Sequence, residues 1–99
     1  MKYLDGATAW RREGEGFERV VLPCVWQGVQ GANPGNVGDS NARSTLVLLP
    51  PEAVPLKRGD YVSEGIVEGE TPASDAYAVT TVEAVRVRGA LHHWEVTAT

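Results

Sequence analysis

The sequence has one cysteine and no long apolar run, and each shortage excludes a class of protein. Cys24 has no second cysteine to pair with, which excludes a disulfide-stapled scaffold and agrees with a reducing compartment. The longest apolar stretch, LVLLPP from Leu46, is far shorter than the roughly 18 residues that span a bilayer, so we expect no membrane partner. The first residues, MKYLDGATAW, have no apolar central region, so they are not expected to form a secretory signal. We therefore expect the protein to be made in, and to stay in, a cytoplasm.

Basic residues are also few. The chain has 9 Lys and Arg against 13 Asp and Glu, a net charge of -4. This balance argues against non-specific binding of nucleic acid, which depends on clustered cations that neutralise phosphates. Hydrophobic residues make up 42% and charged residues 22% of the chain, as in an ordinary globular protein. The 99 residues predict a single domain over residues 1–99 with a modest core.

What the sequence does contain is a series of short strand patterns. Residues 7–12 and 17–27 are predicted to form an opening hairpin, because the EGEG between them is a common type of hairpin connection. Residues 76–87 also fit helical spacing, but six β-branched residues in twelve favour a strand. The remaining strands are expected at residues 44–50, 61–69 and 92–98.

About six short strands without an amphipathic helix predict an all-β fold, a small antiparallel β-barrel or sandwich with one long glycine-rich loop. Closure into a barrel is attractive because it removes exposed sheet edges. Trp10, Trp26 and Trp94 fall near strand ends, where they are expected to fill the core. The alternative for these tryptophans, a stacking platform for single-stranded nucleic acid, needs basic neighbours that an acidic chain does not supply.

No residue pattern predicts catalysis, and we expect no catalytic residue, no cofactor and no metal. Cys24 shares an apolar strand face with its neighbours two residues away on either side, which favours a buried, inert thiol over a nucleophile. His92 and His93 are adjacent on a predicted strand, so their side chains should point to opposite faces and cannot hold one metal ion together. Arg58-Gly59-Asp60 resembles an integrin-binding motif, but a tight turn into a strand explains it more simply.

The glycine-rich segment of residues 28–43, GVQGANPGNVGDSNAR, is the most unusual part of the sequence. Unstructured loops longer than about 12 to 15 residues are uncommon in compact domains and are usually functional or disordered. Glycine and asparagine adopt many backbone conformations, so this loop is suited to taking a new shape when a partner supplies contacts.

Taken in order, several segments resemble the small head-closure, or head-to-tail joining, proteins of long-tailed phages and prophages, also labelled minor capsid proteins. The shared features are an opening strand pair that ends in Val25 and Trp26, an apolar strand that ends in proline, a Gly-Asp turn into a strand, and a valine-rich strand before the last one. The matching stretches are ATAWRREGEGFERVVLPCVWQG, STLVLLP, LKRGDYVSEG, YAVTTVEAV and HHWEVTAT. One departure is ETPASDAYAV, which inserts residues between Gly69 and Tyr77 where the family often has a G-x-x-Y-x-V run.

The resemblance implies a small β-barrel that forms a ring beneath the portal, seals the DNA-filled head and joins the tail. It implies that the long loop is a gate or interface loop, and we hypothesise that Asn33, Pro34 and Asn36 lie at its tip and that Arg43 anchors its base. The candidate interface residues are Gly28, Gly31, Asn33, Pro34, Gly35, Asn36, Gly38, Asp39, Asn41 and Arg43. The expected partners are portal or adaptor proteins, tail proteins and other copies of the chain, with DNA only as passing cargo. The expected location is the virion, and the bacterial host cytoplasm during assembly. The alternative is a monomeric oligonucleotide-barrel or SH3-like module that binds a protein or peptide.

Overall fold

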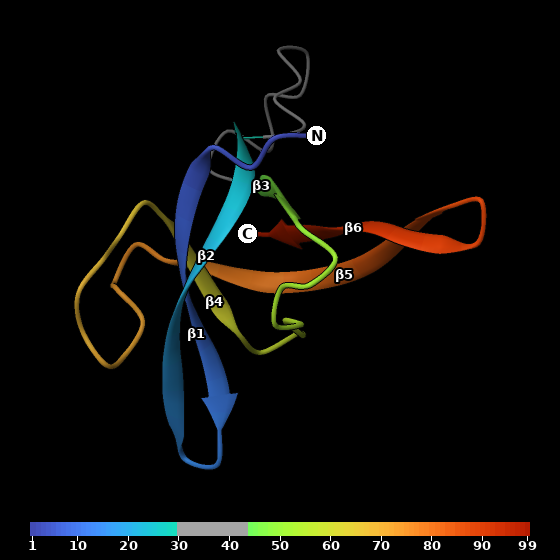
Figure 1. Cartoon of the computed structure of the whole chain (residues 1–99). Coiled ribbons are helices and arrows are strands. Elements are labelled where there is room, and N and C mark those ends of the chain that lie inside the picture. Colours follow the sequence, from blue (N-terminus) through green and yellow to red (C-terminus); the bar gives the residue numbers. More distant parts are fainter. Residues whose placement is uncertain (30–43) are drawn as a thin grey trace, which may run out of the picture.

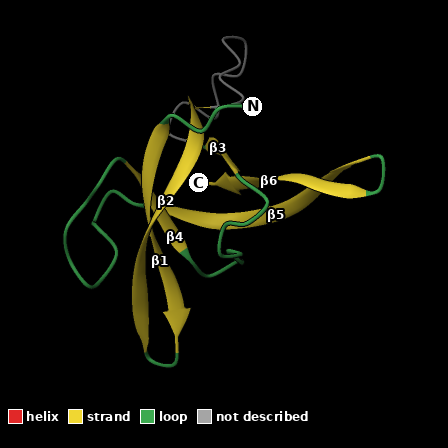
Figure 2. Cartoon of the chain, viewed as in Figure 1, coloured by secondary structure: helices red, strands yellow, loops and turns green. Residues whose placement is uncertain are grey.

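A computed structural model of the chain describes residues 1–29 and 44–99, in which every regular element is a strand (Figures 1 and 2). The strands pair antiparallel in the order β1-β2-β3-β6-β5-β4 and close into a barrel. The predicted all-β class is confirmed, and the architecture is the barrel. No helix that could cross a membrane occurs in these residues. The strands are β1 (Asp5–Glu13), β2 (Gly16–Val29), β3 (Thr45–Leu49), β4 (Tyr61–Glu64), β5 (Tyr77–Val87) and β6 (Ala90–Ala98).

All six strands occur where the sequence predicts them, but most boundaries differ by one or two residues, and the end of β4 differs most. β4 ends at Glu64, five residues early, because Gly65 has a φ of 80° and turns the chain out of the sheet. Ile66 is therefore 71% exposed, although a longer strand would have placed it on the same face as Val62. β6 begins at Ala90, two residues early, directly after a tight turn. The helical alternative for residues 76–87 is wrong, since they form β5.

The barrel interior is filled by one side-chain face of each strand. Trp26 and Trp94 are partly buried and pack against this core, as predicted. Trp10 is fully buried but lies outside it, because its strand neighbour Ala9 faces inward and Trp10 therefore faces outward. The core residues are Ala7, Ala9, Leu22, Cys24, Val47, Leu49, Leu56, Val62, Val79, Val96 and Ala98.

Two hairpins extend beyond the closed part of the barrel. β4 pairs with β1 only as far as Trp10, so residues 11–18 form a two-stranded extension, here called the first arm. β3 pairs with β6 only as far as Trp94, so residues 85–93 form a second arm from β5 and β6. The two arms project in different directions from the barrel (Figure 1).

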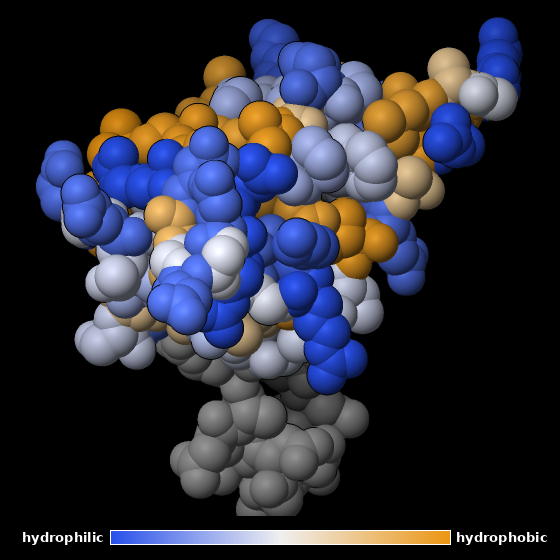
Figure 3. Space-filling model, turned by 90° about the horizontal axis from the view of Figure 1, so that it is seen from below, coloured by the Kyte–Doolittle hydropathy of each residue, from blue (hydrophilic) through white to orange (hydrophobic). Residues whose placement is uncertain are grey.

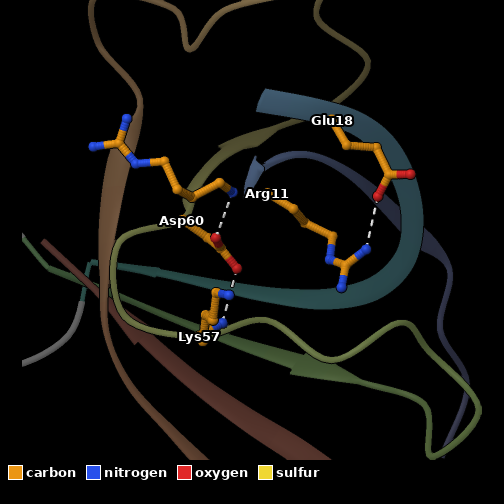
Figure 4. A network of polar contacts seen from close by, with 5 residues as sticks. Arg11, Glu18, Lys57 and Asp60 are labelled. Carbon is orange, nitrogen blue, oxygen red and sulfur yellow. Dashed lines mark hydrogen bonds and ion pairs between the residues drawn. The ribbon is translucent and has the colours of Figure 1, made fainter. Parts of the chain in front are cut away.

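Asp60 joins the segment just before β4 to the base of the first arm through hydrogen bonds (Figure 4). The side chain is 1% exposed, and its two oxygens accept hydrogen bonds from the backbone N–H groups of Arg12 and Lys57, both at 2.8 Å. Gly59, with a φ of 103°, allows the tight turn that brings Asp60 there. The Arg58-Gly59-Asp60 tripeptide is thus a structural turn with a buried carboxylate.

Candidate functional site

The predicted loop residues lie almost entirely outside the described part of the chain. Gly28 is described: it belongs to β2, has a φ of 71° and sits within a register shift between Trp26 and Val29. Val29 and Thr45 are register partners in β2 and β3, so the intervening segment leaves and re-enters the barrel at neighbouring positions. The candidates that lie outside the described residues are Gly31, Asn33, Pro34, Gly35, Asn36, Gly38, Asp39, Asn41 and Arg43.

Cys24 is a buried thiol of the barrel core. It has no exposed surface, and burial raises the pKa of its thiol from 9.0 to about 11, with smaller contributions from Asp5 and Glu64. Because the thiolate is the reactive form of cysteine, a raised pKa keeps this side chain unreactive near neutral pH. The geometry agrees with the sequence interpretation of an inert residue.

His92 and His93 contact each other, which strand alternation does not predict. Their Nδ1 atoms are 2.8 Å apart and their ring centroids 5.0 Å apart. Val85 pairs with His93 and Arg86 with Leu91, so His92 is an extra residue of β6, at a bulge that breaks the regular alternation. The Nε2 atom of His93 lies 3.2 Å from a carboxylate oxygen of Glu95. Among residues 1–29 and 44–99, however, no group of three or more His, Cys, Asp or Glu side chains could hold a metal ion.

A recess of about 300 Å³ lies between β2, β4 and the start of β5. Two aromatic rings in its wall, Trp26 and Tyr77, pack edge to face with their centroids 5.8 Å apart. Glu64 and Asp75 add two exposed carboxylates. Ser63 is 7% exposed, and its hydroxyl has no hydrogen-bond partner. Aromatic faces next to carboxylates attract cations, so the recess suits a positively charged group. Its lining residues are Trp26, Ser63, Glu64, Val67, Asp75 and Tyr77.

The wall of the recess is held in place by side chains of β1 and β2. The Thr8 hydroxyl is fully buried; it donates to the Gly65 carbonyl at 2.8 Å and accepts from the Val67 N–H at 2.9 Å. Arg19 Nε donates to the Val67 carbonyl at 2.8 Å, and Trp10 Nε1 donates to the Gly69 carbonyl at 3.0 Å. The first residues after β4 are therefore fastened to the outside of the barrel.

The tip of the second arm carries the opposite charge to the recess. Arg86 and Arg88 are exposed, and neither forms an ion pair with a described carboxylate. Arg88 and Gly89 both have a positive φ, 53° and 83°, as in the two-residue type I′ turns that match the twist of a hairpin. Between the two arginines, Val87 is 50% exposed.

Apolar side chains are also exposed at separate points of the surface. Figure 3 shows apolar patches within a largely polar face of the molecule. Single exposed apolar residues are common in soluble proteins, so these patches become candidate contacts only in combination with the arms. The large exposed hydrophobic residues are Met1, Leu4, Val21, Val54, Ile66 and Val87.

Comparison with known families gives one match. The sequence model of the "Family of unknown function (DUF6751)" matches residues 7–99, nearly the whole chain and all but the first two residues of β1. No curated protein and no solved structure matches the chain.

Proposed function

The chain belongs to the family of unknown function DUF6751, and we propose that it is a virion structural protein of a tailed phage or prophage. In this role it acts without catalysis, as part of the head-tail connector beneath the portal, where it helps to seal the DNA-filled head and to join the tail. The resemblance of its strand-by-strand motifs to head-closure proteins supports this proposal.

The two arms are the observation that carries the proposal. Residues 11–18 and 85–93 extend past the closed barrel and pair only within their own hairpins. Strands that reach beyond a core add little to the burial that stabilises a monomer, but they provide surfaces for neighbours. A ring subunit needs two unlike contact surfaces, one for each neighbour. Arms that project in different directions (Figure 1) are suited to supply them.

The charge of the chain suits a protein that lines a DNA channel. The net charge is -4, so the surface as a whole repels the phosphate backbone. DNA that leaves the head past such a surface does not adhere to it. This agrees with a role in which DNA is passing cargo rather than a bound ligand.

Co-sedimentation with phage particles tests the proposal. Purified particles or portal-bearing heads from the host are expected to carry the chain at a fixed stoichiometry, while isolated tails lack it. Particles that are complete and infectious without the chain would contradict the connector role.

A second candidate function is a monomeric barrel that binds a protein or peptide partner. The recess with Trp26, Tyr77 and two carboxylates favours this alternative, because it is suited to a basic side chain. The two functions differ in their requirement for assembly. A binding module holds its ligand as a monomer with saturable affinity, whereas a connector subunit acts only within a ring.

A further inference from the structure

Two features of opposite charge lie at opposite ends of one strand. β5 begins at Tyr77, in the wall of the recess, and ends at Val87, between the arginines of the second arm. Its 11 residues place the two ends roughly 33 Å apart along the strand. In Figure 1 the β4–β5 connection, which contributes Val67 and Asp75 to the recess, lies on the left of the barrel, and the β5–β6 turn lies on the right.

The arm tip is built to present a cation. Arg88 occupies the first position of the two-residue turn, at the point of the arm farthest from the barrel. An arginine in the left-handed region is less favourable than asparagine or glycine there, so the turn itself does not require this residue. The arm is formed by the paired β5 and β6, which makes it a stiffer support than a single-stranded loop.

The recess offers what a guanidinium group requires. Trp26 and Tyr77 provide aromatic surface, and Glu64 provides an exposed carboxylate with no ion-pair partner among the described residues. Asp75 brings a second carboxylate to the same recess. Arginine combines cation–π contact with charge-assisted hydrogen bonds to carboxylates, and it does both better than lysine.

We propose that the recess of one copy of the chain receives the Arg88 side chain of a neighbouring copy, with Trp26 and Tyr77 against the guanidinium and Glu64 as its principal ion partner. This inference rests on the proposed ring and names its subunit contact. Because the arm tip and the recess are different surfaces at opposite ends of β5, each copy binds one neighbour through its arm and another through its recess. Such heterologous contacts build a ring if they close and a filament if they do not.

The inference is tested with two variants, each of which removes one side of the contact. Arg88→Asn removes the cation and keeps a residue suited to the turn, whereas Glu64→Gln removes the carboxylate and keeps the arm. Sedimentation velocity over a concentration series, up to the solubility limit, is expected to show self-association of the wild-type chain that weakens at high salt. Each variant alone should associate at least about tenfold more weakly. Arg58→Gln, which removes an exposed cation elsewhere, should leave association unchanged.

Mixing the two variants gives the most specific outcome. Arg88→Asn keeps an intact recess and Glu64→Gln keeps an intact arm, so an equimolar mixture should form a 1:1 heterodimer and nothing larger. A wild-type chain that stays monomeric, variants that associate like the wild type, or a mixture without the heterodimer would each overturn the inference.

Particle association separates this inference from the proposed function. If the chain sediments with heads but the two variants self-associate normally, the connector role stands and the Arg88 contact is wrong. If the heterodimer forms but the chain is absent from particles, the contact stands and the connector role is wrong.

Discussion

Asp60 is the buried residue with the clearest structural role. Its carboxylate has two backbone N–H groups, those of Arg12 and Lys57, as partners, each in a different segment of the chain. Buried donors that lose their acceptor cost about 1–3 kcal/mol each, and bonds to a charged acceptor are stronger than neutral ones. The residue is therefore expected to contribute far more to stability than any exposed charge of the barrel.

Asp60→Asn should lower the free energy of unfolding by about 2–3 kcal/mol, because the amide NH₂ then faces one of the two backbone donors. Urea unfolding followed by tryptophan fluorescence measures this loss. Glu18→Gln is the control: it breaks the 2.7 Å ion pair with Arg11, whose partners are exposed, and should cost less than about 1 kcal/mol. Equal losses in the two variants would contradict the role given to Asp60.

Cys24 makes stability depend on pH in the alkaline range. In the unfolded chain the thiol ionises near its ordinary pKa of 9.0, whereas in the barrel its pKa is about 11. Below pH 9 both states keep the proton and this residue adds no pH dependence. As the pH rises from 9 through 11, the unfolded state loses the proton first, so the folded state is progressively destabilised.

Urea unfolding of the wild type and of Cys24→Ala, at several values from pH 8 to 10.5, isolates this effect. The difference in unfolding free energy between wild type and variant should be constant below pH 9 and shift against the wild type above it. Other groups that titrate in this range cancel in the comparison. A difference that stays constant up to pH 10.5 would contradict the raised pKa.

At the scale of elements, the segment after β4 depends on Thr8. The Thr8 hydroxyl makes one hydrogen bond to the Gly65 carbonyl and one to the Val67 N–H. Valine has nearly the same shape but cannot form either bond. The exchange therefore tests the fastening of this segment with little change in packing.

Thr8→Val should destabilise the protein by about 1–3 kcal/mol and speed hydrogen exchange at the Val67 amide, whose acceptor is lost. Hydrogen exchange read by mass spectrometry or NMR measures the local effect. Thr80→Val is the matched control, since Thr80 makes one side-chain bond, to the Thr97 carbonyl at 3.0 Å. It should leave the Val67 amide protected, and exposure of that amide in both variants would contradict the local role of Thr8.

The sequence predicts the strands well where turn residues are unambiguous, and less well elsewhere. The residues in β2 that alternate toward the core, such as Leu22 and Cys24, are readable because alternation has a period of two. The start of β6 cannot be read from the sequence in this way, because Arg88 occupies a left-handed turn position where glycine or asparagine is the usual signal. The contact between His92 and His93 depends on the bulge at His92 in β6, which the alternation of side chains along the sequence does not reveal.

The recess was not predictable for a similar reason. Its residues come from β2, β4, β5 and the β4–β5 connection, and only the register of three strand pairings brings Trp26, Glu64 and Tyr77 together. In the sequence, Glu64 reads as one of several carboxylates on a solvated face. Predicting the fold class requires only the number and type of the elements. Predicting the site also requires the register in which the strands pair.

At the scale of the whole molecule, the barrel should fold without the glycine-rich segment. Val29 and Thr45 are register partners across β2 and β3, so a two-residue Asn-Gly turn can join the strands in place of residues 30–44. The thermal unfolding midpoint of this variant should be unchanged or slightly raised, because a shorter loop costs less closure entropy. Calorimetry measures it, and a large drop would show that the barrel depends on the segment.

The same variant should fail to join particles if the segment is an interface in the connector. Co-sedimentation of the replaced chain with heads, compared with the wild type, measures this. Arg58→Gln serves as a control whose association should not change. Normal incorporation of the replaced chain would contradict a gate or interface role for the segment.

The strand order has a consequence for how fast the barrel forms. β1–β2 and β5–β6 are hairpins of neighbouring segments, but closure needs β1 to meet β4 and β3 to meet β6 across most of the chain. Long-range pairings of this kind make folding slow, in the range of about milliseconds to seconds for small β domains. During synthesis, β3 has no partner on its outer edge until β6 has left the ribosome. β3 therefore gains its second neighbour last, and the barrel closes only once β6 has been synthesised.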